Sequence, residues 1–197
     1  MEKSLSKKIL QDQYVVQKKS VSEISKTHRC SQSKINYWLV KYGIEKRSIS
    51  EAVYLINNPH GDPFKFVPPK NIEDAKLFGM GIGLYWGEGN KLNKNIVKLG
   101  NSDPALLKVF INFLIKFFRI DKGDLKYHLH IFSDISTDTA LTYWKKQMGA
   151  NSKQFYKPTI TITGKIGTYR KKSEYGVLTV YYANTKLRNK LISLLPL

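Results

Sequence analysis

One stretch near the middle of the chain constrains its fold more than any other: residues 77–89, which read LFGMGIGLYWGEG. Apolar residues recur in it with helical spacing, yet glycines interrupt it, and each glycine inside a helix costs about 1 kcal/mol relative to alanine. Ala75, Gly79, Gly83 and Gly87 fall at every fourth position. In a helix they form one ridge without large side chains, which lets a second helix approach closely. The run is too short to span a bilayer, so we expect a tight helix pair in a soluble protein.

The predicted helix ends at Glu88 and Gly89. Gly89 suits the left-handed backbone that often follows a helix C-terminus, whereas the Glu88 carboxylate lies at the negative end of the helix dipole. A cation would relieve that repulsion, and hard divalent cations such as Mg²⁺ prefer carboxylate and carbonyl oxygens. Pairing with the same helix of a second subunit would bring two Glu88 carboxylates together. On these residues alone, a metal site and an exposed glutamate at a fraying helix end both stay open.

Residues 81–89, GIGLYWGEG, resemble the LAGLIDADG motif of homing endonucleases and their relatives. In that family the motif helices pack face to face along small residues, and the acid beside the final glycine binds the catalytic divalent metal. The resemblance implies a metal site at Glu88 and Gly87, with Mg²⁺ as the cofactor. The single motif implies a homodimer through the ridge. Gly81 and Trp86 depart from the family pattern, at positions that carry no chemistry in the family.

The resemblance extends from about residue 72 to the C-terminus and is strengthened by the turn at 101–104, NSDP. It implies a saddle-shaped sheet that is backed by helices and sits astride DNA. Two departures put the usual contacts in doubt, because the hairpin at 90–101 is short and residues 134–165 read as an inserted helix and strand. In many family members a lysine near the last strand–helix junction positions the attacked phosphate, which makes Lys186 a candidate catalytic residue.

The first fifty residues carry a second recognisable pattern. The sequence predicts three helices there, at residues 4–18, 20–29 and 31–43. Ser20 and Glu23 form a predicted capping box. Two short helices joined by a tight turn make a helix-turn-helix, and residues 23–39 resemble DNA-binding units of this kind position by position. Arg29 stands where a turn glycine is usual, a conformation that costs energy for any other residue.

The third of these helices would be the DNA-recognition helix. Its predicted exposed positions are Gln32, Ser33, Lys34, Asn36 and Tyr37. Glutamine and asparagine can pair bidentately with adenine, and lysine with guanine. Further DNA contacts are expected from Lys94, Lys98, Lys165, Arg170, Lys171 and Lys172. The alternative is a three-helix scaffold that docks onto another protein and leaves these polar side chains merely solvated.

Charge indicates the kind of partner. The 197 residues include 33 Lys and Arg against 15 Asp and Glu, a net charge of +18, which points to nucleic acid or another anionic surface. The single cysteine, Cys30, excludes a disulfide framework and a cysteine-type zinc site. We recognise no secretory signal and no apolar run of membrane-spanning length. We therefore expect an intracellular protein of the cytoplasm or nucleoid without a membrane partner.

The remaining pattern predicts an α+β fold. Strands are expected at 96–101, 125–132, 159–163 and 177–182, and helices at 104–118, 137–149 and 184–194. His128 and His130 share one strand face, as a metal pair could. No further histidine or cysteine lies at metal-ligand spacing, and we interpret the two as ordinary strand residues.

The predicted organisation has three parts: a helix-turn-helix module at 1–50, a linker at 51–70 rich in proline and glycine turns, and a LAGLIDADG-like domain at 71–197 with a saddle sheet backed by helices. The expected function is sequence-specific binding of double-stranded DNA by a homodimer that hydrolyses phosphodiesters with Mg²⁺. Two alternatives remain. One is a transcription regulator that kept the fold and lost cleavage, and the other is an RNA-binding or splicing factor.

Overall fold

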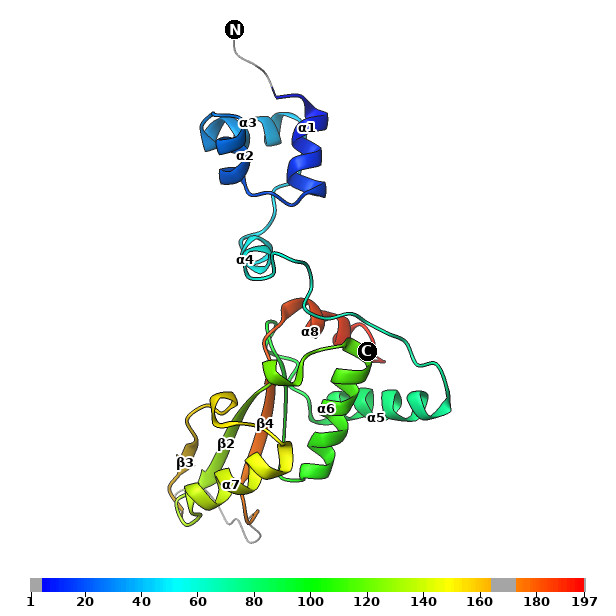
Figure 1. Ribbon diagram of the computed structural model, residues 1–197, viewed down its shortest axis with the longest axis vertical. Helices are drawn as coiled ribbons and strands as arrows, with labels where there is room; N and C mark the ends of the chain where they lie inside the picture. The colour runs from blue at the N-terminus through cyan, green and yellow to red at the C-terminus, as the bar shows by residue number, and fades with distance from the viewer. Residues whose placement is uncertain (1–4, 164–172, 197) are drawn as a thin grey trace. The chain divides into compact units, whose positions relative to one another are not determined.

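The computed structural model describes residues 5–163 and 173–196. It contains two compact units, Met1–Pro63 and Phe64–Leu197 (Figure 1). The predicted α+β class is confirmed, because the described residues form helices in both units and one mixed four-stranded sheet in the second. Within the described ranges, no helix is both long enough and apolar enough to cross a membrane.

The boundary between the units falls inside the predicted linker, residues 51–70. The first part of that segment is helical and belongs to α4 (Ile49–Asn57), none of whose residues is buried. The last part belongs to the second unit, where the backbone N–H of Val67 donates to the carbonyl of Phe117 at 2.8 Å. The prolines that predicted a linker therefore stiffen an extended segment that runs along the end of a helix.

The first unit packs short helices around a small apolar core. Before α4, its elements are α1 (Lys7–Gln11), the π-helical η1 (Asp12–Val16), α2 (Val21–Thr27) and α3 (Gln32–Lys41). The predicted helix at 4–18 thus changes to wider π turns in its second half. The predicted capping box is confirmed: the Ser20 N–H donates to the Glu23 carboxylate at 2.7 Å, and the Glu23 N–H donates to Ser20 Oγ at 3.1 Å. Arg29 adopts the left-handed backbone of the turn, with φ 48°.

Arg47 connects the segment after α3 to the first helical segment of this unit. Its guanidinium donates to the carbonyls of Lys18 at 2.8 Å and Tyr14 at 3.2 Å, and also to that of Lys19. It also lies 4.0 Å from the centroid of the Tyr14 ring. These contacts satisfy the Tyr14 carbonyl of η1 and two carbonyls of the turn that follows it. The chain segment after α3 is therefore tied back to the first helical segment.

The second unit begins with the motif helix. This helix, α5 (Ile72–Glu88), is continuous over 17 residues despite its glycines. Asn71 caps its N-terminus by accepting from the Asp74 N–H at 2.8 Å. The Asp74 carboxylate in turn accepts from the Lys70 N–H at 3.1 Å and pairs with the Lys116 ammonium at 2.5 Å. The first turn of α5 is thereby fixed to the neighbouring helix α6.

The sheet has the strand order β1-β4-β2-β3. Its strands are β1 (Val97–Asn101), β2 (Lys126–Phe132), β3 (Thr159–Thr161) and β4 (Val177–Tyr182). β4 is antiparallel to both of its neighbours, and β3 is parallel to β2. The remaining elements are α6 (Pro104–Phe118), α7 (Thr137–Met148), α8 (Thr185–Ile192) and the 3₁₀ turns η2 (Lys122–Asp124) and η3 (Ser152–Gln154).

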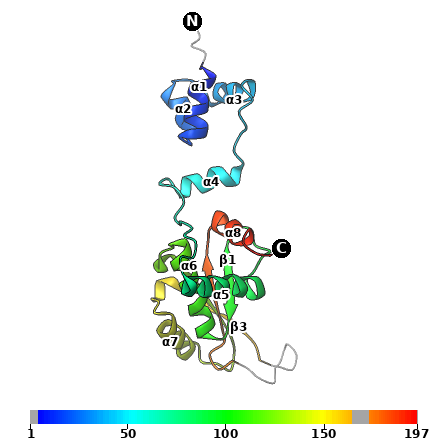
Figure 2. The same ribbon diagram turned by 90° about the vertical axis from the view of Figure 1, so that its right-hand side faces the viewer.

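The two faces of the sheet differ. Helices α6 and α7 lie on one face (Figures 1 and 2), and alternate strand residues that point toward them are buried. That buried set includes Leu99, Leu129 and Val180. The residues between them are half-buried or exposed, so the second face of the sheet is accessible. We call this second face the open face.

The structure locates two segments whose elements were predicted from the sequence, 90–101 and 134–165. The short hairpin at 90–101 contributes a single strand, β1, and the chain before it makes one isolated bridge, between Gly89 and Leu99. The predicted insertion at 134–165 contributes α7 and β3. β3 adds to the edge of the sheet beside β2.

Candidate nucleic-acid interface and active site

The candidate recognition helix, α3, begins at a serine cap, with the Ser31 hydroxyl accepting from the Lys34 N–H at 3.2 Å. Ile35 and Leu39 are fully buried and hold the helix on the core of the first unit. Of the predicted DNA-contacting residues, Gln32, Ser33 and Tyr37 are exposed, whereas Lys34 and Asn36 are half-buried. The structure therefore presents most of the predicted set on one outer surface.

Sequence reasoning missed two residues on this surface. Val40 is 68% exposed, and it lies three positions after the exposed Tyr37, on the same side of the helix. The Lys41 ammonium lies 4.7 Å from the centroid of the Trp38 ring, which stacks on Tyr42. An exposed aliphatic side chain can contact a thymine methyl group, and a lysine can contact phosphate. Helical spacing could have predicted that Val40 is exposed, because it lies three and four positions after Tyr37 and Asn36, which the sequence predicted to face outward.

The predicted ridge on α5 faces away from its own unit. Ala75, Gly79, Gly83 and Gly87 are all exposed. A Cβ atom built on any of these three glycines would meet no atom of the described residues within 4 Å. Large apolar side chains beside the ridge are also exposed, among them Ile72, Met80 and Trp86. The structure thus brings the predicted dimer residues together on one unoccupied, largely apolar helix face.

Glu88 is the last residue of α5 and is exposed. The predicted left-handed Gly89 is wrong: its φ is −72° and its ψ is 143°, which is extended backbone. Gly89 is needed for a different reason, because a Cβ there would lie 2.3 Å from the Tyr85 ring and 2.4 Å from the Tyr85 carbonyl oxygen. The chain leaves α5 by passing directly over the Tyr85 ring.

The loop after α5 brings one cation, Lys91, to the C-terminal end of the helix, and a second cation, Arg188 of α8, holds that loop. The Lys91 ammonium donates to the carbonyl of Trp86, in the last turn of α5. The Arg188 guanidinium, from α8, donates to the Lys91 carbonyl and holds the loop in place. The Tyr85 hydroxyl donates to the Asn90 carbonyl at 3.3 Å, and burial raises the pKa of Tyr85. The helix end that carries Glu88 is therefore already partly neutralised by this chain's own lysine.

The donors at this helix end suit a hard divalent cation. Glu88 offers a carboxylate, and the Gly87 carbonyl lies in the last turn, where carbonyls have no partner inside the helix. Among the residues that the structure describes, no three His, Cys, Asp or Glu side chains come together. A metal held by Glu88 and Gly87 would therefore need further ligands from a second copy, from DNA phosphate or from water.

The other predicted contacts are dispersed. Lys94 is exposed in the loop after α5, and Lys98 lies on β1 with its ammonium 5.4 Å from the centroid of the Tyr181 ring. Lys186 is half-buried in the first turn of α8. The remaining predicted contacts, Lys165, Arg170, Lys171 and Lys172, lie outside the described residues.

The open face of the sheet carries the two histidines. His128 Nε2 lies 3.0 Å from Thr159 Oγ1, and His130 Nε2 lies 2.7 Å from Thr161 Oγ1. Burial lowers the pKa of His128, and the nearby His130 and Lys98 lower it further. These contacts fix both rings on the sheet and occupy the Nε2 atom of each.

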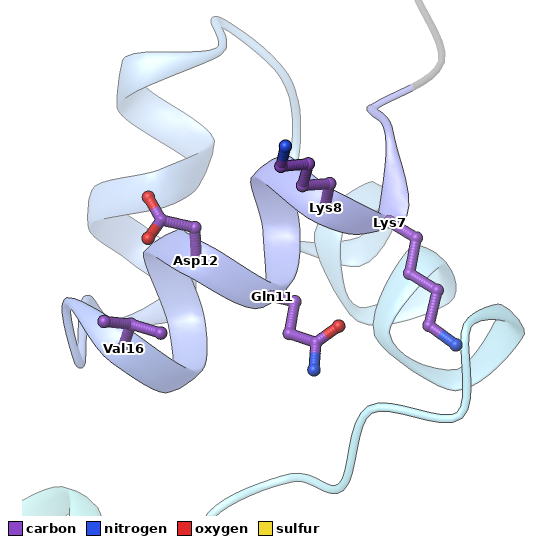
Figure 3. Close-up of a pocket in the computed structure, with 5 residues that line it drawn as sticks. All are labelled: Lys7, Lys8, Gln11, Asp12 and Val16. Carbon is purple, nitrogen blue, oxygen red and sulfur yellow. The ribbon is translucent and has the colours of Figure 1, made fainter.

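A separate surface hollow of about 440 Å³ lies beside α1 and η1. Its lining residues are Lys7, Lys8, Gln11, Asp12 and Val16. All of them come from one helical segment, and their polar groups do not converge on a common point (Figure 3). The hollow therefore lacks the converging polar groups that orient a small ligand.

No protein-family model matches this chain, and neither a curated protein nor a solved structure is significantly similar to it.

Proposed function

We propose that this protein is a sequence-specific DNA-binding protein that acts as a homodimeric, Mg²⁺-dependent endonuclease of the LAGLIDADG type. The observation that carries the proposal is the pairing of two features on α5. The small-residue ridge of Ala75, Gly79, Gly83 and Gly87 is exposed and unused within the described chain, and the exposed Glu88 carboxylate ends the same helix. Two copies joined along the ridge would place two such carboxylates beside each other.

The charge distribution supports DNA as the substrate. The net charge is +18, and both parts of the chain are basic. In the first unit, α3 would enter the major groove with Gln32, Ser33, Asn36 and Tyr37 toward base edges. Lys34 would add a contact to guanine or phosphate. Sequence preference would then come mainly from the first unit, because the short β1 hairpin offers little surface for base reading.

Each residue near the helix end has a separate part in the proposed chemistry. Glu88 and the Gly87 carbonyl would hold Mg²⁺, which would activate water and stabilise the leaving oxygen when bound. Lys186 would contact the phosphate under attack. Lys91 and Arg188 hold the loop that follows α5, so they position Glu88 without touching the reacting atoms.

Replacing Glu88 tests this proposal. Glu88→Gln should abolish Mg²⁺-dependent cleavage of DNA from the protein's own genomic neighbourhood. Binding measured in EDTA should stay equal or become tighter, because a negative charge near the phosphates is removed. Glu73→Gln is the matched control, since Glu73 is an exposed glutamate in the first turn of the same helix, paired only with exposed Lys76. A wild type that binds its site tightly but never cuts in Mg²⁺ or Mn²⁺ would overturn the nuclease.

A transcription regulator is the second candidate, and a specific contact favours it. The Lys91 ammonium already occupies the end of α5, so the helix dipole can be neutralised without metal. A regulator would still need the recognition helix. Asn36→Ala should therefore weaken binding to the specific site by about 1–3 kcal/mol and leave binding to random DNA nearly unchanged. Equal losses on both DNAs would show that α3 makes only electrostatic contacts.

A further inference from the structure

The open face of the sheet carries a row of rings to which the proposed nuclease chemistry assigns no role. The row consists of Tyr156, Tyr181, His128, His130 and Phe132. Along it, the ring centroids of Tyr156 and Tyr181 are 5.9 Å apart, those of Tyr181 and His128 are 6.5 Å apart, and those of His130 and Phe132 are 6.2 Å apart. His128 and His130 are alternate residues of one strand, which places them at a similar interval. We call these five residues the aromatic row.

The rings are accessible and held in place. Tyr156 is 51% exposed, His130 is exposed, and the other three are half-buried. Tyr181 meets its neighbours Tyr156 and His128 nearly edge to face, at interplanar angles of 84° and 81°. In an edge-to-face pair the edge of one ring lies against one face of the other, so each pair covers at most one ring face, and the exposed parts of Tyr156 and His130 stay open to a flat ligand. The threonine contacts of the two histidines keep that part of the row from rotating.

The surroundings of the row are suited to a polyanion. None of the four strands contains an aspartate or a glutamate. Lys98 and Lys126 lie opposite Tyr181 on its two sides, because the strand register pairs each of them with that residue. The Lys98 ammonium lies over the Tyr181 ring at 5.4 Å. A base that stacks there would move the ammonium toward the adjoining phosphate, where it gains a charged partner.

The spacing of the rings selects among nucleic acids. Bases in a duplex rise about 3.4 Å per nucleotide along a strand and turn their faces toward each other. Ring intervals of 5.9 to 6.5 Å are nearly twice that rise, so the row cannot follow stacked bases. It can accept bases that are unstacked along an extended strand, and every base has a face that can stack on an aromatic ring.

We propose that the open face of the sheet binds single-stranded nucleic acid, with successive bases stacked along the aromatic row and phosphates near Lys98 and Lys126. This activity goes beyond the proposed function, because it requires neither Glu88 nor a second copy of the chain. Stacking gives little sequence preference, so this surface would complement the sequence-specific recognition helix.

Binding of labelled homopolymers to the full-length protein tests the proposal. Fluorescence anisotropy would be recorded in EDTA with a 12-nucleotide oligo(U), the matching oligo(dT) and a duplex, using Glu88→Gln as the parent so that cleavage plays no part. Tyr181→Leu should weaken single-strand binding by about 5- to 100-fold, and Tyr181→Phe should preserve it because the ring is kept. Tyr143→Leu, on α7 in the helical layer, is the matched control and should change nothing.

Several outcomes would overturn the inference. Unchanged single-strand affinity in both Tyr181→Leu and Tyr156→Leu would do so. Tyr156→Leu is included because its ring is exposed, so the substitution should disturb the packing of the fold little. An equal loss for duplex and single strand would show that the open face binds duplex DNA. A preference for oligo(U) over oligo(dT) would assign the ligand to RNA through its 2′-hydroxyl, and the reverse would assign it to DNA. Failure of Mg²⁺-dependent cleavage in the wild type would leave this result unaffected.

Discussion

The two sides of α5 use glycine in opposite ways. On the buried side, a Cβ at Gly81 would lie 2.1 Å from the Phe113 ring, so α6 can approach only because no side chain is there. On the exposed side, Gly79, Gly83 and Gly87 border open space. Each costs about 1 kcal/mol of helix propensity that no described contact of the chain repays. The comparison teaches that this chain's own fold explains one glycine, whereas no contact among the described residues explains the other three.

Gly81→Ala tests the difference between the two sides of α5 most directly and should have the largest effect. The Phe113 ring is packed against the rings of Phe78, Phe110, Phe117 and Phe118, so it cannot move aside without disturbing the core. We expect the free energy of unfolding to fall by about 1–3 kcal/mol or more, as in other overpacked cores. Chemical denaturation would measure the loss.

Gly79→Ala is the matched control for that variant, because it makes the same change two residues away on the exposed side. It should not destabilise the monomer. If both alanine variants lost the same free energy, the glycines would matter through helix propensity or chain flexibility, and the difference between the two sides of α5 would disappear.

The second prediction concerns the ion pair that fixes the buried side of α5. The hydrogen bond from Lys116, and then the one from the Lys70 backbone, hold the pKa of Asp74 below its ordinary value of 3.8. The folded state therefore binds this proton less readily than the unfolded chain does. The stabilisation is complete above that ordinary value and is lost as the pH falls through the lowered folded-state pKa.

Thermal unfolding followed from about pH 6 down to about pH 3 would measure this loss. The melting temperature of the wild type should fall steeply at the acid end, whereas Asp74→Asn should start lower and show a shallower decline. Glu73→Gln, which disturbs only an exposed pair on the other side of the same turn, should keep the wild-type profile. An unchanged acid slope in Asp74→Asn would show that Asp74 does not fix α5 to α6.

Local signals in the sequence were sufficient for most elements. The capping box of Ser20 and Glu23, the Ser31 cap and the Asp103-Pro104 start of α6 each act within one turn of chain, so they could be read directly. The four-residue spacing on α5 likewise placed its ridge on one face. The exposed position of that face also followed, because side-chain-free ridges serve contacts between helices.

Contacts between distant residues could not be read in the same way. The extended backbone of Gly89 depends on the Tyr85 ring beneath it, and the position of Lys91 depends on Arg188, 97 residues away in the sequence. The aromatic row escaped notice because its rings come from β2, β4 and the segment before β3, which only the sheet register brings together. The alternation of apolar and polar residues predicted each strand but did not predict the order of the strands in the sheet.

The smallest predicted effect distinguishes a free exposed side of α5 from one that joins a second copy of the chain. In an isolated chain, Gly83→Ala should raise the free energy of unfolding by up to about 1 kcal/mol, since alanine favours helix and the site has room. In a dimer joined along the ridge, the added methyl groups would force the two helices apart, and the same substitution should weaken association. The two effects have opposite signs, so one variant distinguishes a free face from a dimer face.

Sedimentation equilibrium and denaturation of Gly83→Ala at low and high protein concentration would separate them. For Gly83→Ala we expect a weaker dimer together with a monomer that is slightly more stable than the wild type. Gly83→Leu should weaken the dimer further, until the subunits separate. A wild type that stays monomeric at micromolar concentration, with and without DNA, would contradict the dimer. The exposed glycines would then need a different partner, because the described chain gives no reason for alanine to be absent there.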